Sequence, residues 1–327
     1  KIGETEFSLS AIPLGGYVEI AGALEVGQGE QKEALRTDEY SFRSKPLYQK
    51  FCIMIAGIFF NILFAYGALI TLYMVGLPKH HLLYPKNAHP IIESILKDSA
   101  AQRYGLQKGD RIRAVNDINI DDNVQKLLEL VRPYAREHIT LIVERNNELV
   151  TIDLVTDKVK TPLYTKPVGS LGVIFELIDL PPYPVWKAIT EGFSLTNEYI
   201  VRTVSGLISS ILRKDTSNMV SPVMIISLTS KGAAAGFKVF IIFLVIISIG
   251  LGMLNLLPLP IFDGGQILFY TIEAIIRRPL PNYIREYIHI ISWILLLLFV
   301  LYLSVRDVIH IANPYIESVT HFLGFGK

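Results

Sequence analysis

The apolar residues of this chain are concentrated in three long runs separated by more polar segments. The runs cover Phe51–Leu77, Val239–Leu257 and about Ile288–Val305. A helix needs about 20 largely apolar residues to cross the hydrocarbon core of a bilayer. The pattern therefore predicts three membrane-spanning helices.

A different pattern runs from roughly Val185 to Leu212. Apolar residues recur there at spacings of three and four, which predicts one amphipathic helix with its charged residues off the apolar face. Such a helix fits two placements. It can lie in the membrane interface, or it can pack on a soluble part of the protein.

Residues 78–182 form a soluble insert. At its centre the glycines permit a turn, Asp110 can bond the adjoining backbone, and a buried strand begins, in the run Gly105-Leu-Gln-Lys-Gly-Asp-Arg-Ile-Arg-Ala-Val-Asn116. A helix over Asn123–Tyr134 follows. Two strands come next, joined by a two-residue turn at Asn146-Asn147, and they cover Ile139–Arg145 and Leu149–Val155.

The glycine-rich centre of the insert resembles a PDZ signature, GLxxGDxIxxVN, although Asp117 stands where that family usually has glycine. PDZ domains commonly bind extended peptides or chain ends by strand addition. The alternative is a spacer that only limits access. Residues 156–184 are rich in proline without clear periodicity, so we expect a linker there.

The first 50 residues are mixed and polar. Alternation with period two in Phe7–Ile12 and Tyr17–Ile20, around Pro13-Leu14-Gly15-Gly16, favours a β-hairpin over a loop leading to the first helix. The chain starts with lysine and shows no signal peptide, so we expect that it lacks its native N-terminus.

Composition excludes several kinds of site. The net charge of +1 gives no reason to expect nucleic acid as a partner. The only cysteine, Cys52, excludes a disulfide or a cysteine-based zinc site within one chain. None of the seven histidines forms His-Glu-x-x-His, and adjacent side chains such as His80 and His81 diverge, so a solvated interfacial pair is expected there.

Asp263 is the first charged residue after Lys238, and it ends the run Asn255-Leu-Leu-Pro-Leu-Pro-Ile-Phe-Asp-Gly-Gly265. An ionisable residue at a membrane edge is a functional-site candidate. Irregular backbone at that depth is tolerated only where protein or water covers it. Asp263 could instead cap the following helix, with Gln266 reaching back, and a metal-ligating carboxylate could do both.

Two asparagines lie near these features. Asn61, in the run from Gly57 to Ala65, could form an interhelical hydrogen bond that small neighbours allow by close approach. Asn255 could end a helix or orient a peptide backbone. The sequence alone leaves both alternatives open.

Counting membrane crossings places residues 1–50 and 258–287 on one side, and the insert and residues 306–327 on the other. Arg277, Arg278 and Arg285 in the short 258–287 loop favour the cytoplasm for that side.

The order of these motifs resembles the bacterial site-2 proteases. The hairpin sequence FSLSAIPLGGYVEI, the GxxxN of Gly57–Asn61, one PDZ-like insert and NLLPLPIFDGGQ occur in that order over nearly the whole chain. NxxPxPxxDGG between membrane spans is the specific part of the resemblance. Two departures are a single PDZ-like unit, where some relatives have two, and Ser221-Pro222 in place of a Ser-Gly-Pro run.

The resemblance implies an intramembrane endopeptidase that uses Zn²⁺. In that family two histidines and a general-base glutamate lie in an HExxH helix, and the aspartate of the DGG motif, here Asp263, is the third protein ligand of the metal. It further implies that Asn61, Asn255, Pro258, Pro260, Gly264 and Gly265 support the active site. Residues Ile12, Pro13, Leu14, Gly15, Gly16, Tyr17 and Val18 would form a membrane-reentrant hairpin that binds substrate as an added strand.

The HExxH helix does not occur in these residues, and we expect it to precede Lys1; the alternative is an inactive relative. The expected fold is a multi-pass α-helical membrane protein with an inserted α+β PDZ-like domain and a membrane-associated β-hairpin. The expected division is 1–50 with the hairpin, 51–77 as a transmembrane helix, 78–160 PDZ-like, 161–236 linker and amphipathic helix, 237–287 transmembrane helix and active-site segment, and 288–327 C-terminal helix and tail.

The expected partners are the lipid bilayer and a transmembrane protein or peptide substrate, such as an anti-sigma factor or a remnant signal peptide. The expected location is the bacterial inner membrane, with the insert on the periplasmic or outer side. The competing hypothesis is a non-catalytic membrane adaptor that binds peptide ends through the PDZ-like insert.

Overall fold

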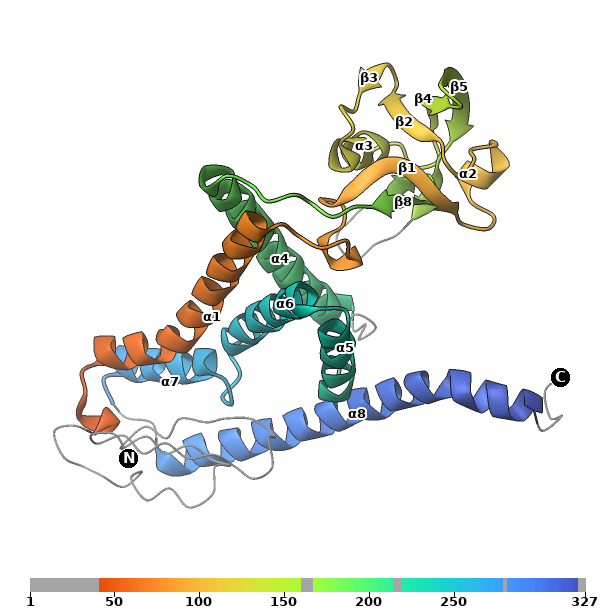
Figure 1. Cartoon of the computed structure of the whole chain (residues 1–327). Helices are drawn as coiled ribbons and strands as arrows, with labels where there is room; N and C mark the ends of the chain where they lie inside the picture. Colours follow the sequence, from red (N-terminus) through yellow and green to blue (C-terminus); the bar gives the residue numbers. More distant parts are fainter. Residues whose placement is uncertain (1–40, 160–166, 214–218, 279–280, 323–327) are drawn as a thin grey trace. The chain divides into compact units, whose positions relative to one another are not determined.

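The computed structural model of the chain describes residues 41–159, 167–213, 219–278 and 281–322 (Figure 1). The expected hairpin over Ile12–Val18 lies outside these residues. The chain divides into two compact units. One unit comprises Lys1–Gly57 and Leu256–Leu296, and the other comprises Ile58–Asn255 and Leu297–Lys327.

Within the described ranges, three helices are long and apolar enough to cross a membrane. They are α1 (Leu47–Val75), α6 (Phe237–Asn255) and the part of α8 (Asn282–Phe322) that covers Tyr283–Ile309. These helices coincide with the three apolar runs. The expected third span is the least accurate, because α8 continues well beyond Val305.

Helix α8 continues past its apolar part because the charged residues Arg306 and Asp307 form hydrogen bonds there. Asp307 is buried and accepts a hydrogen bond from the backbone N–H of Ser221 at 2.8 Å. The neighbouring Arg306 donates to the Met219 carbonyl at 2.5 Å. Ser221 in turn caps α5 (Pro222–Ala234), a helix that the sequence analysis did not predict. A charged pair at the end of an apolar run therefore need not end a helix.

The insert folds around an antiparallel sheet of strand order β5-β4-β2-β1-β8, with β3 paired to β2. Two further strands, β6 and β7, pair with each other. The strands are β1 (Ala88–Ile95), β2 (Arg111–Val115), β3 (Ile118–Asn119), β4 (His138–Arg145), β5 (Glu148–Val155), β6 (Asp157–Val159), β7 (Val168–Ser170) and β8 (Val173–Leu177). The short helices α2 (Ala100–Arg103) and α3 (Val124–Val131) complete the insert.

The β4–β5 hairpin confirms the turn expected from the sequence. Arg145 pairs with Glu148, and the two residues between them, Asn146 and Asn147, have φ values of 52° and 66°. Both therefore adopt the left-handed conformation that asparagine tolerates and that a tight two-residue hairpin turn requires. The predicted helix is also present, although it is shorter than expected and is capped by the Asn123 side chain.

The expectation of a structureless linker over residues 156–184 is wrong for the described part of that range. Strand β8 lies within it and pairs with β1, for example through Ile92 and Phe175. Alternation of apolar residues in Val173–Leu177 signals this strand, but the surrounding prolines obscured it. The sheet is completed by a strand that is distant in sequence.

Asp110 is the buried charge at the centre of the insert. It is 1% exposed, and its carboxylate receives two hydrogen bonds of 2.7 Å from Arg145, on β4, and one of 2.8 Å from the backbone N–H of Gln107. This contact also raises the pKa of the Arg145 guanidinium. The pair fixes the glycine turn against the hairpin.

Replacing Arg145 with methionine should destabilise the insert by about 3–5 kcal/mol, because it leaves the Asp110 charge buried and unpaired. The change is measurable by hydrogen exchange of the sheet amides in the full-length protein. Arg103→Met is the matched control, because the Arg103–Asp157 ion pair is more exposed and should contribute about 1 kcal/mol or less. Equal losses in the two variants would contradict the importance of burial.

The insert connects to the helices through several short contacts. Leu77 and Leu180 exchange two backbone hydrogen bonds of 3.1 and 2.9 Å, and the N–H of Tyr183 donates to the Tyr73 carbonyl at 2.9 Å. His80 begins the turn η2 (His81–Leu83), where its Nδ1 accepts from the Leu82 N–H, and burial lowers the pKa of its imidazole. The ring centroids of His80 and His81 are 6.4 Å apart, with an angle of 64° between the ring planes.

Candidate functional site

Asp263 is the first residue of α7 (Asp263–Ile276), and the chain before it is tightly folded. The N–H of Leu259 donates to the Leu257 carbonyl at 2.8 Å, and the N–H of Phe262 donates to the Leu259 carbonyl at 2.9 Å. These local bonds satisfy backbone groups that an irregular segment would otherwise leave open. The helical conformation of α6 does not continue here because Pro258 and Pro260 lack the backbone N–H that a helix requires.

The two glycines after Asp263 are required by close packing. A Cβ atom on Gly264 would lie 2.5 Å from the Leu256 carbonyl oxygen, and one on Gly265 would overlap the Leu259 carbonyl. Real Cβ atoms do not come so close to backbone. Glycine therefore allows the first turn of α7 to lie directly on the preceding loop, and this places the Asp263 side chain.

The capping interpretation of Asp263 is wrong for this helix. Phe262 occupies the N-cap position, and no side-chain hydrogen bond caps the helix. Gln266 donates to the Pro260 carbonyl at 3.0 Å instead of reaching back to the helix start. The Asp263 carboxylate therefore does not accept a hydrogen bond from the backbone of α7 and can bind another group.

The Asp263 carboxylate is half-buried and has no hydrogen-bond or ion-pair partner among the described residues. Burial raises the pKa of this carboxyl above its ordinary value. A half-buried carboxylate that is not engaged by protein groups is free to bind a cation, whose charge would favour the ionised form. The arrangement fits one ligand position of a metal site.

Gly57 of α1 faces Asp263. A Cβ atom on Gly57 would lie 3.9 Å from Oδ2 of Asp263, so the absence of a larger side chain keeps the carboxylate accessible. Sequence reasoning treated Gly57 only as a point of close approach between helices. The GxxxN spacing could have indicated this role, because it places Gly57 and Asn61 one turn apart on the same face of α1.

Asn61 forms the interhelical hydrogen bond that was one of its two interpretations. Its carbonyl and its Oδ1 both accept from the hydroxyl of Ser248 on α6, at 3.1 and 3.3 Å. Gly252, also on α6, permits the close approach, since its Cβ would lie 3.6 Å from that of Asn61. Asn61 therefore braces α1 against α6. Asn255 is the half-buried last residue of α6.

The other ligands of a metal are not found nearby. No group of three or more His, Cys, Asp and Glu side chains that could hold a metal ion occurs in the described part of the chain. The hairpin residues Ile12 to Val18 also lie outside it. Asp263 is thus the member of the expected donor set whose position the structure gives.

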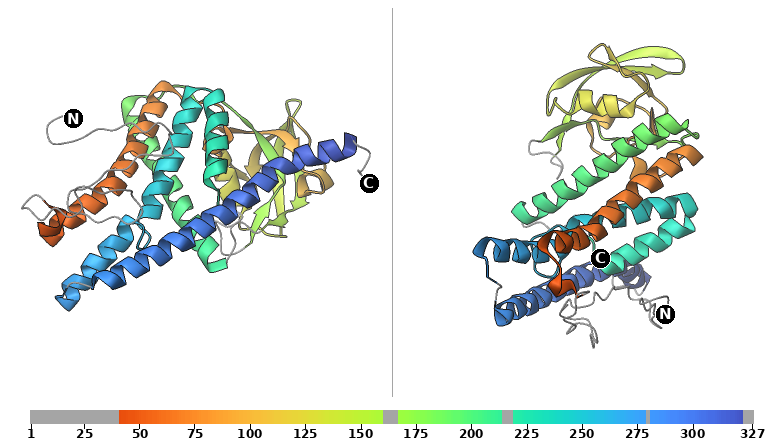
Figure 2. Two further views of the ribbon diagram at one scale, coloured as in Figure 1. Left: turned by 90° about the horizontal axis from the view of Figure 1, so that it is seen from below. Right: turned by 90° about the vertical axis from the view of Figure 1, so that its left-hand side faces the viewer.

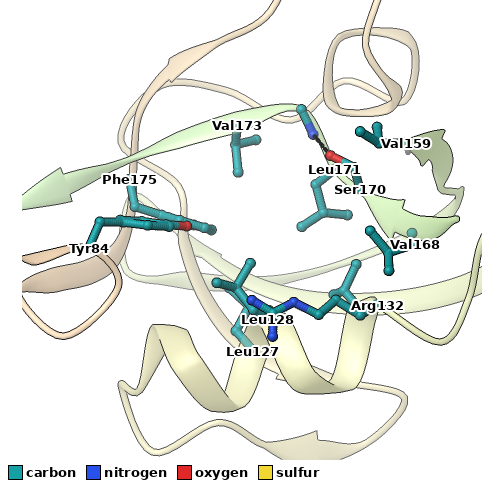
Figure 3. A pocket seen from close by; sticks show the side chains of 13 residues that line it. Tyr84, Leu127, Leu128, Arg132, Val159, Val168, Ser170, Leu171, Val173 and Phe175 are labelled. Atoms are coloured by element: carbon teal, nitrogen blue, oxygen red, sulfur yellow. Dashed lines mark hydrogen bonds between the residues drawn. The ribbon is translucent and has the colours of Figure 1, made fainter. Parts of the chain in front are cut away.

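A second candidate site is a cavity of about 270 Å³ in the insert. It lies between α3 and the segment that carries β7 and β8, and Figure 3 shows Leu127, Leu128 and Arg132 on the helix side facing Leu171, Val173 and Phe175. Among the strands that the structure describes, β8 pairs only with β1, so its other edge is unpaired, and Val173 and Phe175 of β8 line the cavity. An open strand edge beside an apolar cavity can receive an extended peptide.

The turn before β8 depends on Gly172. Gly172 has a φ of 74°, and its N–H donates to the Ser170 hydroxyl at 3.3 Å. A Cβ atom on Gly172 would overlap the Ser99 side chain. Sequence reasoning missed this site because it assigned Ser170 to Phe175 to a linker.

Comparison with known proteins gives a consistent result. The model of the family described as peptidase family M50 matches residues 1–299. Relatives named "putative zinc metalloprotease" occur in several bacteria. The one from Campylobacter jejuni is 31% identical over 319 residues, which is 93% of this chain and 80% of the relative. The one from Fusobacterium nucleatum is 31% identical, and the match covers 95% of this chain and 86% of the relative. The one from Mesorhizobium japonicum is 29% identical, and the match covers 90% of this chain and 82% of the relative.

Proposed function

The chain belongs to peptidase family M50, the site-2 proteases, and from this premise we propose that it is an intramembrane zinc endopeptidase that cleaves transmembrane segments of other proteins. The observation that supports the proposal best is the Asp263 carboxylate, which faces Gly57 and has no partner within the described part of the chain. A protein retains such a group at a membrane edge when the group has a task.

Asp263 is the third protein ligand of the zinc ion in this proposal. Bound zinc would polarise the scissile carbonyl and lower the pKa of its water to about 7. Gly264 and Gly265 hold the ligand in place by letting α7 lie on the preceding loop, and Pro258 and Pro260 keep that loop out of helical conformation. Residues 1–327 contain no HExxH sequence, so the two histidines and the general-base glutamate that the proposal requires are not among them.

The remaining site residues position helices and substrate. Asn61 braces α1 through its bonds to Ser248, and Asn255 supports the site from the end of α6. In this proposal residues Ile12–Val18 would pair with the substrate as an added strand. A helical substrate must be unwound before cleavage, because its carbonyls are engaged in internal hydrogen bonds.

The insert is a PDZ-like domain on the periplasmic side of the bacterial inner membrane, and its cavity binds an extended, largely apolar peptide along the edge of β8. Arg277 and Arg278, which lie between α7 and α8, support this orientation. Regulated proteolysis of an anti-sigma factor, or removal of a remnant signal peptide, is the physiological role that fits such an arrangement.

Leu128→Lys should weaken binding of an apolar peptide to the insert by about tenfold or more, because it places a charge on the cavity wall. Fluorescence anisotropy with a labelled peptide ending in apolar residues measures the effect on the full-length protein. Glu129→Lys, an exposed change on the same helix, is the control and should leave the affinity unchanged. If neither variant differs from the parent, the cavity is not the peptide site.

The competing function is a membrane adaptor that binds peptides through the insert and cleaves nothing. The cavity beside β8 favours it as much as it favours the protease. Two observations distinguish the functions. The coding sequence upstream of Lys1 should encode an apolar helix with HExxH, and the purified full-length protein should contain zinc. A helix without that motif, or a protein without metal, would leave the adaptor as the better account.

A further inference from the structure

Tyr270 of α7 contacts two cations that come from two other helices. The Lys50 ammonium of α1 is 5.4 Å from the centroid of the Tyr270 ring, and the Arg285 guanidinium of α8 is also 5.4 Å from it. Both distances are within the range of a cation–π contact. Figure 2 shows the end of α7 beside the beginning of α8, which brings Arg285 to this ring. We call Lys50, Tyr270 and Arg285 the cationic cluster.

Aromatic packing holds the cluster in place. Phe42, which lies in the turn η1 (Phe42–Ser44) and is 3% exposed, packs edge-on against Tyr270 with a centroid distance of 5.9 Å. The Lys50 ammonium is 5.8 Å from the Phe42 ring as well. Two rings thus fix the position of the lysine charge, and three separate elements of the chain converge on one point.

The cluster carries more positive than negative charge. The carboxylate beside it belongs to Glu273, which accepts from Nη2 of Arg285 at 2.6 Å and also attracts Lys50. Nε of Arg285 has no acceptor within the described part of the chain, and 31% of the side chain is exposed. The guanidinium can therefore bind a further anion in addition to Glu273.

The cluster lies where two membrane-spanning segments begin. Lys50 is in the first turn of the span Leu47–Val75, and Arg285 is in the first turn of the span Tyr283–Ile309. Exposed tyrosines, which are enriched where a membrane meets water, flank both starts: Tyr48, Tyr283 and Tyr287. The two cations are therefore at the level of the lipid headgroups.

Two further arginines lie at the same turn of the chain. Arg277 adopts the left-handed conformation, with a φ of 56°, and ends α7. Arg277 and Arg278 are both exposed, and they precede the first turn of α8, which carries Arg285. Basic pockets between membrane helices attract anionic headgroups. The charge around the cluster thus has the sign that favours such a ligand.

We propose that the cationic cluster binds the phosphate group of an anionic phospholipid. Guanidinium and ammonium groups are the side chains that bind phosphate, and the negative charge reduces the repulsion between Lys50 and Arg285. A zwitterionic lipid binds more weakly because its own ammonium opposes these cations. Soluble phosphate shares the chemistry, but the depth of the cluster favours the lipid. The proposal does not depend on protease activity.

Native mass spectrometry of the full-length protein in detergent, titrated with phosphatidylglycerol or with phosphatidylcholine of the same acyl chains, tests the proposal. The parent should bind phosphatidylglycerol about tenfold more tightly, because two cations face one net negative charge. Lys50→Gln should weaken phosphatidylglycerol binding by about fivefold and leave phosphatidylcholine binding unchanged. Lys50→Arg keeps the cation and should retain the preference.

Two control variants separate this site from general attraction to charge. Lys187→Gln removes a cation that lies 3.9 Å from another tyrosine ring, that of Tyr183. Arg278→Gln removes an exposed cation near the cluster. Both should change phosphatidylglycerol affinity by about twofold or less, because exposed charges are screened by salt.

Three results would overturn the proposal. The first is equal binding of the two lipids by the parent. The second is an effect of Arg278→Gln or Lys187→Gln as large as that of Lys50→Gln, because the attraction would then be diffuse. The third concerns the thermal unfolding of the parent in detergent: inorganic phosphate that raises the midpoint as much as phosphatidylglycerol does at equal concentration would assign the cluster to a soluble anion.

Discussion

Asp263→Ala is expected to abolish cleavage of a membrane reporter while leaving the protein inserted and folded. The side chain makes no hydrogen bond or ion pair within the described residues, so its removal should cost little stability. Loss of a zinc ligand removes a Lewis-acid contribution of several kcal/mol, which corresponds to about 10³-fold or more in rate. Reporter cleavage in cells and zinc content of the purified full-length protein measure the two effects together.

The matched control for this variant is Glu286→Ala, which removes an exposed acidic residue of the same structural unit on α8. It should keep both cleavage and zinc. Full cleavage by the Asp263→Ala protein would refute the ligand role. Loss of cleavage with normal zinc content would instead assign Asp263 to substrate contact, and the proposed donor set would have to be revised.

Gly265→Ala is expected to be the most damaging single-methyl addition near the site. The new Cβ atom would overlap the Leu259 carbonyl, which is backbone and cannot rotate away. The first turn of α7 must then move, and the Asp263 carboxylate moves with it. A displacement of about 1 Å at a catalytic group can reduce the rate by about 10²-fold. The rate should therefore fall strongly even if the protein still inserts.

Gly250→Ala is the informative comparison, because Gly250 lies in α6 and a Cβ atom there would meet nothing within 4 Å. Alanine in a helix interior is favoured over glycine by about 1 kcal/mol, so this variant should be as active as the parent and slightly more stable. Thermal denaturation in detergent and the reporter assay would be run on both. Equal activity of the two alanine variants would mean that close packing at Gly265 does not position the site.

The elements that the sequence predicted well are those whose signal is local. Apolar length alone identified α1 and α6, and the Asn146-Asn147 turn followed from the preference of asparagine for positive φ. Asp263 was identified because it is the first charged residue after a long uncharged segment. These signals are contained in a few consecutive residues.

Other features depend on residues far apart in the chain, and the sequence could not supply them. Strand β8 is recognisable only through its pairing with β1. The extension of α8 past Val305 depends on Ser221, whose N–H donates to Asp307, and on Met219, whose carbonyl accepts from Arg306. The finding that Gln266 does not complete a helix cap with Asp263 depends on where Gln266 donates its hydrogen bond.

The paired backbone of Leu77 and Leu180 has an evolutionary consequence. The polypeptide leaves α1 and returns toward α4 (Val185–Arg213), the predicted amphipathic helix, at adjacent points, since Leu77 and Leu180 exchange two backbone hydrogen bonds. A module whose ends meet can be gained, lost or duplicated without altering the distance that the rest of the polypeptide must span. A module of another size could therefore replace the insert between these two residues without moving α1 or α4.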